Sequence, residues 1–169
     1  MSNILTDGKR ICLLDLNYTL VSNQQDTKYL RPFSRRMEAE EYRLDLINAI
    51  KDDYVIIVTA RPDYQQEQTM KNVFAKTGWM PAEMYFNDLG AEPPVYKESA
   101  LKRFIFPKHG DDGSIYYAVE SNPRTRAMYS RYGIAAQPYD KFIKGGSQNA
   151  AVRQTVKKPE IIASQLTLF

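Results

Sequence analysis

Three short, largely apolar segments, each followed by a polar side chain, constrain the fold more than any other feature of the sequence. The segments and the residues that follow them are 10–14 with Asp15, 54–58 with Thr59, and 115–119 with Glu120. Apolar, β-branched runs of this length predict buried strands. A strand that ends in this way delivers a polar side chain to one edge of a sheet.

Helical patterns separate the predicted strands. The predicted helices cover residues 36–50, 63–76, 98–104 and 124–132, and residues 84–86 predict a further short strand. Alternating strands and helices predict an α/β fold, with a mostly parallel sheet and helices on both faces. Such sheets carry their sites beyond the carboxyl ends of the strands. The residues that follow the strands are therefore candidates for a site.

The length and the cysteine content bound the class of protein. A chain of 169 residues fits one compact domain with a tail. The N-terminal residues do not resemble a signal peptide, and the apolar residues 11–14 are far too few to span a bilayer. The single cysteine, Cys12, lies in an apolar run and is expected as a small buried hydrophobe. These features predict a soluble, intracellular protein.

The basic charge belongs to the tail. Residues 141–169 hold five basic residues and one acidic residue, a charge of +4, whereas the whole chain carries +3. We expect a domain at residues 1–142 and a flexible basic linker at 143–164, rich in small and polar residues. Such a linker either approaches a nucleic-acid backbone or keeps the segment solvated. The apolar residues 165–169 then predict a docking peptide.

The polar residues near the strand ends suggest phosphoryl chemistry. They are two carboxylates, two hydroxyls and one cation: Asp15, Glu120, Thr19, Thr59 and Arg61. Two carboxylates without a histidine or cysteine cluster suit a hard cation such as Mg²⁺. A carboxylate beside Mg²⁺ and hydrogen-bond donors is equipped to attack phosphorus. Phosphoryl transfer through an aspartyl-phosphate is the natural hypothesis.

Four segments in order resemble the motifs of the haloacid dehalogenase superfamily. They are DLNYTL from Asp15, VIIVTARP around Thr59, PPVYKESAL around Lys97, and YYAVESNPRTRAMYSRYGI around Glu120. The resemblance spans residues 10 to about 140 and implies a three-layer, Rossmann-like fold. It implies Asp15 as the nucleophile, with Thr59 and Lys97 as phosphate binders. It also implies Mg²⁺ held by Asp15, Glu120 and the backbone carbonyl of Asn17.

Two positions depart from the family pattern. Family phosphatases usually carry a second aspartate, a general acid and base, where this chain has Asn17. An amide cannot exchange protons near neutral pH. Ser121 replaces another common aspartate, which weakens the expected affinity for metal. A degenerate domain that only binds a phosphorylated ligand therefore stays open beside the enzyme hypothesis.

One branch of the family suggests the substrate. The TARP sequence, Gln68 and Thr69, and the Asn-Pro-Arg stretch ending at Arg124 resemble the phosphatase domain of phage polynucleotide kinases. This implies a nucleotide or nucleic-acid 3′-phosphate, with Thr19, Arg61 and Arg124 as candidate substrate contacts. Surface ion pairs explain the two arginines equally well. The short segments between the motifs predict no large cap domain, and an open site accepts a polymer end.

The last five residues resemble the peptide that binds the bacterial sliding clamp. Leu166, Leu168 and Phe169 would be the apolar anchors and Gln165 the polar orienter. Alternatively, this apolar end folds back as a final strand.

The first hypothesis is thus a magnesium-dependent phosphatase brought to DNA by a clamp, in the cytoplasm of a bacterial or phage-infected cell. The second is a noncatalytic adaptor.

Overall fold

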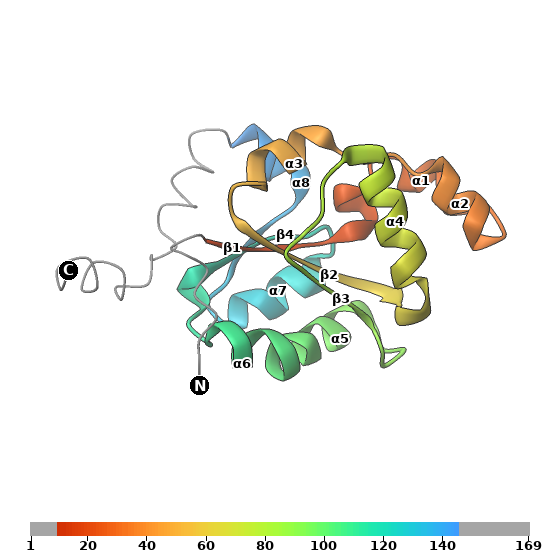
Figure 1. Ribbon diagram of the computed structural model, residues 1–169. Helices are drawn as coiled ribbons and strands as arrows, with labels where there is room; N and C mark the ends of the chain where they lie inside the picture. The colour runs from red at the N-terminus through yellow and green to blue at the C-terminus, as the bar shows by residue number, and fades with distance from the viewer. Residues whose placement is uncertain (1–9, 146–169) are drawn as a thin grey trace, which may run out of the picture.

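The computed structural model describes residues 10–145 and shows a five-stranded parallel sheet between two layers of helices (Figure 1). The strands lie in the order β3-β2-β1-β4-β5, and every neighbouring pair is parallel. Their bounds are β1 Ile11–Leu14, β2 Tyr54–Pro62, β3 Glu83–Asn87, β4 Tyr116–Val119 and β5 Ala135–Gln137. The predicted α/β fold with a parallel sheet is confirmed.

Alternating side chains of the central strand enter two separate cores. Cys12 and Leu14 pack against one helical layer, and Ile11 and Leu13 pack against the other. The first layer comprises α3 (Leu44–Ile50), α4 (Gln66–Thr77) and α8 (Tyr139–Lys144); the second comprises α5 (Pro93–Ala100), α6 (Phe106–His109) and α7 (Pro123–Arg131). Because both faces of β1 are covered, its continuous apolar sequence is explained.

The predicted helix over residues 36–50 is wrong, because the chain forms two helices there. α2 (Phe33–Ala39) ends before Glu40, and α3 begins at Leu44. Between them Tyr42 forms an isolated bridge with Val21. The break turns the fully buried side chain of Glu40 toward the interior, which a continuous amphipathic helix does not do. A further short helix, α1 (Gln24–Thr27), lies between β1 and α2, where no helix was predicted.

The second half of the chain follows the prediction with three differences. α5 starts at the proline pair that precedes the predicted helix, because Pro93 and Pro94 occupy its first turn. It continues through Leu101–Ile105, a widened helical turn, into α6. β5 and α8 were not predicted. The predicted helix over 124–132 is α7, which ends at Arg131, shortly before Gly133 with its φ of 74°.

No large cap domain covers the sheet in the described part of the chain. α1 and α2 form the main excursion between β1 and β2, beside α4 (Figure 1). No helix among residues 10–145 is long and apolar enough to cross a bilayer. The predicted clamp-binding residues, 165–169, and all but the first residues of the predicted linker lie outside the described residues.

Candidate active site

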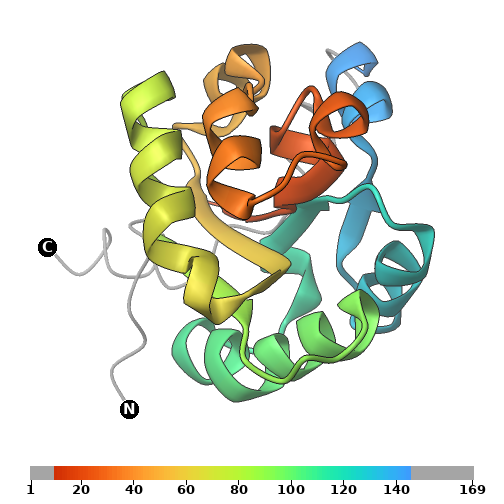
Figure 2. The same cartoon turned by 90° about the vertical axis from the view of Figure 1, so that its right-hand side faces the viewer.

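A polar cavity opens where the strands β1, β2 and β4 end. Figure 2 looks toward this edge of the sheet, with the turn after β1 in red and the helix start after β4 in teal. The cavity has a volume of about 580 Å³. Its lining residues are Asp15, Asn17, Tyr18, Ala60, Pro93, Lys97, Glu120, Ser121, Asn122 and Pro123. Three of the four predicted motifs therefore contribute their named polar residue to one cavity, as expected for a parallel sheet.

Asp15 lies at the base of this cavity and accepts hydrogen bonds on both carboxylate oxygens. Oδ2 accepts from the Thr19 hydroxyl at 2.8 Å and the Ser121 hydroxyl at 2.7 Å. Oδ1 accepts only from the ammonium of Lys97, at 2.9 Å. A carboxylate oxygen has two lone-pair directions. One direction on Oδ1 is thus left for a ligand or for attack on phosphorus.

Lys97 joins Asp15 to the second strand-end carboxylate. Its ammonium lies 2.6 Å from Glu120 Oε2, and all three side chains are buried. Burial favours the neutral amine, but Asp15 and Glu120 outweigh it and raise the pKa of Lys97, which stays charged. Burial and the nearby Asp15 raise the pKa of Glu120, despite Lys97. The pKa of Asp15 is lowered instead, because Lys97 and the hydroxyl donors outweigh its burial.

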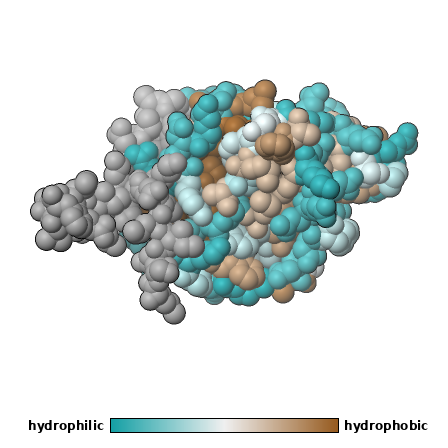
Figure 3. All heavy atoms as spheres, viewed as in Figure 1, coloured by the Kyte–Doolittle hydropathy of each residue, from teal (hydrophilic) through white to brown (hydrophobic). Residues whose placement is uncertain are grey.

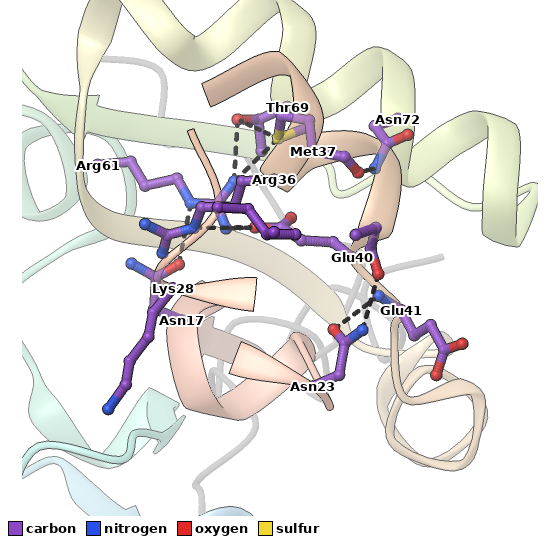
Figure 4. A network of polar contacts seen from close by, with 12 residues as sticks. Asn17, Asn23, Lys28, Arg36, Met37, Glu40, Glu41, Arg61, Thr69 and Asn72 are labelled. Atoms are coloured by element: carbon purple, nitrogen blue, oxygen red, sulfur yellow. Dashed lines mark hydrogen bonds and ion pairs between the residues drawn. The ribbon is translucent and has the colours of Figure 1, made fainter. Parts of the chain in front are cut away.

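Asn17 is held by an arginine that is itself buried and paired. Figure 4 shows the Arg61 guanidinium between Asn17, Glu40 and Thr69. Arg61 Nε donates to Asn17 Oδ1 at 2.9 Å, and Arg61 Nη2 pairs closely with Glu40. Arg61 is only 3% exposed. Its contacts fix the Asn17 amide with the oxygen toward Arg61, which leaves the NH₂ group as the donor that can face the cavity.

The other predicted contacts lie in different surroundings. Thr59 is buried, and its hydroxyl oxygen accepts from the Arg61 backbone N–H at 3.2 Å. Thr19 is also buried, and its hydroxyl donates a hydrogen bond to Asp15 Oδ2. Arg124 lies outside the cavity, with its side chain 69% exposed and paired with Glu92 at 3.1 Å. The structure thus gathers Asp15, Asn17, Lys97 and Glu120, places Thr19 behind Asp15, and leaves Arg124 at the surface.

The oxygen atoms at the cavity base suit a hard divalent cation. The Ser121 hydroxyl lies 2.7 Å from Asp15 Oδ2 and 3.3 Å from the Asn17 backbone carbonyl, so these two oxygens lie close together. Asp15 and Glu120 share one ammonium, which leaves the cluster one negative charge in excess when both are ionised. Carboxylate and carbonyl oxygens are the ligands that Mg²⁺ prefers. The residues implied by the family resemblance therefore fit this ion.

Two residues of the site had no assigned part in the sequence analysis. Ser121 was noted only as a missing aspartate, yet its hydroxyl bonds the candidate nucleophile. Its position next to Glu120, two residues after the strand end, was the available signal. Glu40 gave no signal, because an acid within a predicted amphipathic helix is ordinarily a solvated residue. Its burial follows from the break between α2 and α3.

A larger groove elsewhere on the molecule lacks the buried titratable groups of the Asp15 cavity. It lies between α4 and β3, has a volume of about 790 Å³, and is lined in part by Tyr64, Met70, Phe74 and Met80. Apolar side chains gather near the middle of the face shown in Figure 3. This groove contains no buried pair of titratable groups, whereas the smaller cavity does. Buried, mutually shifted titratable groups mark the smaller cavity as the candidate active site.

Comparison with solved structures supports the fold. A chain in a structure of the Pnkp1/Rnl/Hen1 RNA repair complex matches with a TM-score of 0.58 at 12% identity, covering 79% of this chain and 43% of that one. A chain in a second structure of the Pnkp1/Rnl/Hen1 complex matches with a TM-score of 0.61 at 16% identity, covering 81% and 47%. This chain thus spans less than half of either matched chain. No protein-family model and no curated protein matches the sequence.

Proposed function

We propose that this protein is a magnesium-dependent phosphatase of the haloacid dehalogenase type, which acts on a terminal 3′-phosphate of a nucleotide or nucleic acid. The observation that carries the proposal is Asp15, a buried strand-end carboxylate that three side chains hold at the base of an open cavity. The nucleic-acid substrate is supported by the phage-kinase resemblance of the sequence. The fold shared with chains of an RNA repair complex agrees with it.

Asp15 Oδ1 is the attacking atom, because it accepts only from Lys97, whereas Oδ2 accepts from two hydroxyls and lies on the side of the Asn17 carbonyl, where the cation would bind. A bond forms between Oδ1 and phosphorus while the bond from phosphorus to the leaving oxygen breaks. Lys97 stays protonated and stabilises the carboxylate and the transferred phosphoryl oxygens. Asp15, Glu120 and the Asn17 backbone carbonyl would hold Mg²⁺, which would supply further neutralisation of the phosphoryl charge. Water then cleaves the aspartyl-phosphate, releases phosphate and restores Asp15.

Asn17 sets the speed of this reaction. Its amide can donate a hydrogen bond to the leaving oxygen but cannot transfer a proton to it, so that proton comes from water. General acid–base assistance is worth about 10²- to 10⁴-fold in rate. We therefore propose a slow phosphatase. This same feature favours the second candidate, a noncatalytic domain that binds a phosphorylated ligand.

Phosphate release separates the two candidates. The protein is incubated with Mg²⁺ and, in turn, p-nitrophenyl phosphate, a 3′-phosphorylated oligonucleotide and nucleoside monophosphates. Wild type is compared with Asp15→Asn and with Asp52→Asn, a matched change at an exposed aspartate without a partner among the described residues. Release that is lost in Asp15→Asn and kept in Asp52→Asn supports the phosphatase. Binding of the phosphorylated oligonucleotide without any Asp15-dependent release supports the adaptor instead.

Recruitment by a sliding clamp is a separate proposal that rests on the sequence of residues 165–169 alone. Deletion of these residues should abolish binding to a bacterial clamp in a pull-down. Unchanged binding, or no binding with the tail intact, would refute it.

A further inference from the structure

The excursion formed by α1, α2 and the turn between them, residues 24–39, concentrates the positive charge of the described domain. We call it the α1–α2 projection. Its four basic residues outnumber two acidic residues and give it a charge of +2, while the other described residues sum to −1. Figure 3 shows this end of the molecule mainly as hydrophilic residues. A local excess of this kind attracts a polyanion.

Three of the four cations of the projection have no carboxylate partner among the described residues; the fourth, Arg36, lies 3.9 Å from Glu40. Lys28 donates to the neutral Gln25 side chain at 2.8 Å, and Arg31 donates to two backbone carbonyls. Within residues 10–145, neither of them nor the exposed Arg35 has a carboxylate within ion-pair distance. Elsewhere on the surface, arginines on α7 and after α5 pair with neighbouring acids. The basic side chains of the projection are therefore available to bind anions.

A line of neighbouring groups connects the projection to the cavity. Tyr18 lines the cavity, and its side chain lies in the neighbourhood of Arg36. Burial, together with Arg61 and Arg31, lowers the pKa of Arg36, while Glu40 only partly compensates. The buried Nε of Arg36 has no hydrogen-bond partner. An anion entering beside Tyr18 would relieve this repulsion between cations.

Exposed aromatic rings accompany these cations. Tyr18, which has a positive φ of 61°, is 41% exposed at the cavity mouth, and Tyr29 is 77% exposed at the end of α1. The Lys28 ammonium lies 5.0 Å from the centre of the Tyr29 ring. Figure 2 shows α1 and α2, in orange, beside the red turn that follows β1; this turn, Leu16–Leu20, contains Tyr18. Alternating cations and exposed rings are the features with which proteins bind single-stranded nucleic acid.

We propose that the α1–α2 projection and Tyr18 bind the single-stranded polynucleotide that adjoins the terminal phosphate in the Asp15 cavity. Lys28, Arg31 and Arg35 contact successive phosphates, and Tyr18 and Tyr29 stack on bases. A paired duplex end is a poorer ligand, because its base faces are already stacked. The proposal rests on the proposed function for the phosphate in the cavity, and it makes the protein selective for polymer ends over free nucleotides.

Binding is measured on the full chain carrying Asp15→Asn, so that it does not depend on turnover. Fluorescence anisotropy follows labelled single-stranded DNA and RNA oligonucleotides with a 3′-phosphate, the matching duplex, and unlabelled nucleoside 3′-monophosphate as competitor, over a range of salt. The variant is Lys28→Gln/Arg31→Gln/Arg35→Gln. The control, Lys51→Gln/Lys71→Gln/Lys102→Gln, removes the same charge from exposed positions outside the projection.

We expect the single strand to bind more tightly than the duplex or the monophosphate. The triple variant should lower the slope of log K against log salt by about 2, because each single-strand phosphate contact contributes about 0.7. Tyr29→Ala should weaken binding by about fivefold or more. The control should keep the wild-type slope.

Equal binding of duplex and single strand, or equal slopes in the variant and the control, would overturn the proposal, even if the phosphatase reaction is observed. Absent turnover with the predicted binding would refute the proposed function alone.

Discussion

Two carboxylate clusters lie at opposite ends of the same sheet and differ in how their charge is balanced. At the carboxyl end, Asp15 and Glu120 share the single ammonium of Lys97; we call these three residues the Asp15 cluster. At the amino end, Glu83 alone accepts from four side chains, and together they form the Glu83 cluster. Its donors are Tyr85 at 2.5 Å, His109 at 2.6 Å, Tyr54 at 2.8 Å and Lys108 at 2.9 Å.

The two clusters differ in whether their carboxylates are fully paired. The four donors of Glu83 match the four lone-pair directions of its carboxylate, and they outweigh its burial and hold its pKa well below the usual range. The Asp15 cluster has more carboxylates than cations and faces a cavity of about 580 Å³. A satisfied carboxylate stabilises the fold, whereas an unbalanced one beside a cavity has capacity left for a ligand. Changing an acid to its amide should therefore affect the two clusters differently.

The largest effect is expected from Asp15→Asn. Loss of the nucleophile should lower phosphate release by about 10³-fold or more. Stability should not fall, because Lys97 and Glu120 remain as a balanced pair. Both quantities are measured on one preparation, by phosphate release and by urea unfolding. A variant that is inactive because it is unfolded would remove the contrast between the clusters.

The lysines of the two clusters give the next largest contrast. The Lys97 side chain is 2% exposed, and Lys97→Met leaves two buried carboxylates without a cation. We expect a loss of about 3–5 kcal/mol in the free energy of unfolding. The Lys108 side chain is 45% exposed, and Lys108→Met should cost less than about 1 kcal/mol. Similar losses in urea titrations of the two variants would show that the Asp15 cluster is no more strained than an ordinary surface pair.

Asn17→Asp tests what limits the Asp15 cluster as a catalyst. A carboxylate at this position can activate water, so kcat on p-nitrophenyl phosphate should rise. Arg61, which donates to the Asn17 side chain at 2.9 Å, would keep the new carboxyl group ionised and make it a poor acid. The gain should therefore stay near the lower end of the usual range, about 10²-fold. An unchanged kcat would show that proton transfer is not the limiting step.

Glu83→Gln should affect stability alone. The variant replaces the Glu83 carboxylate, which accepts from four donors, with a neutral amide. This should lower the free energy of unfolding by about 1–3 kcal/mol at neutral pH. Because the folded-state pKa of Glu83 lies below its ordinary value of 4.5, its contribution is complete above that pH and is lost as the pH falls below it. Wild type and variant should thus converge in acid, as measured by urea unfolding at a series of pH values. A constant difference would contradict the charge-based explanation.

The sequence was most informative where a strand ended. Asp15 and Glu120 could be expected together because their strands are parallel and adjacent. Lys97 lies on a helix far from both in sequence, and only the order of the family motifs pointed to it. The fold explains why Asp15, Glu120 and Lys97 lie together. The chemical role of each of them stays a prediction.

The features that the sequence did not predict depend on long-range packing. Glu40 follows a helical pattern in the sequence but is buried beside Arg61, which no local signal reveals. β5 is only Ala135–Gln137 and joins the sheet edge without a strongly apolar run of its own. Arg61 was expected as a substrate contact because the TARP sequence resembles phage polynucleotide kinases, yet its guanidinium is engaged by buried protein groups. Local patterns identify a cation, while tertiary structure decides what it pairs with.

The most direct test of the proposed mechanism is to trap the phosphorylated enzyme. Because Asn17 cannot activate water, the aspartyl-phosphate should break down slowly and accumulate. The full chain is mixed with Mg²⁺ and a 3′-phosphorylated oligonucleotide, quenched in acid, digested and analysed by mass spectrometry. We predict that the peptide containing Asp15 gains the mass of one phosphoryl group, and that Asp15→Asn shows none. Phosphate release by the wild type without phosphorylation of that peptide would contradict the assignment of Asp15 as the nucleophile.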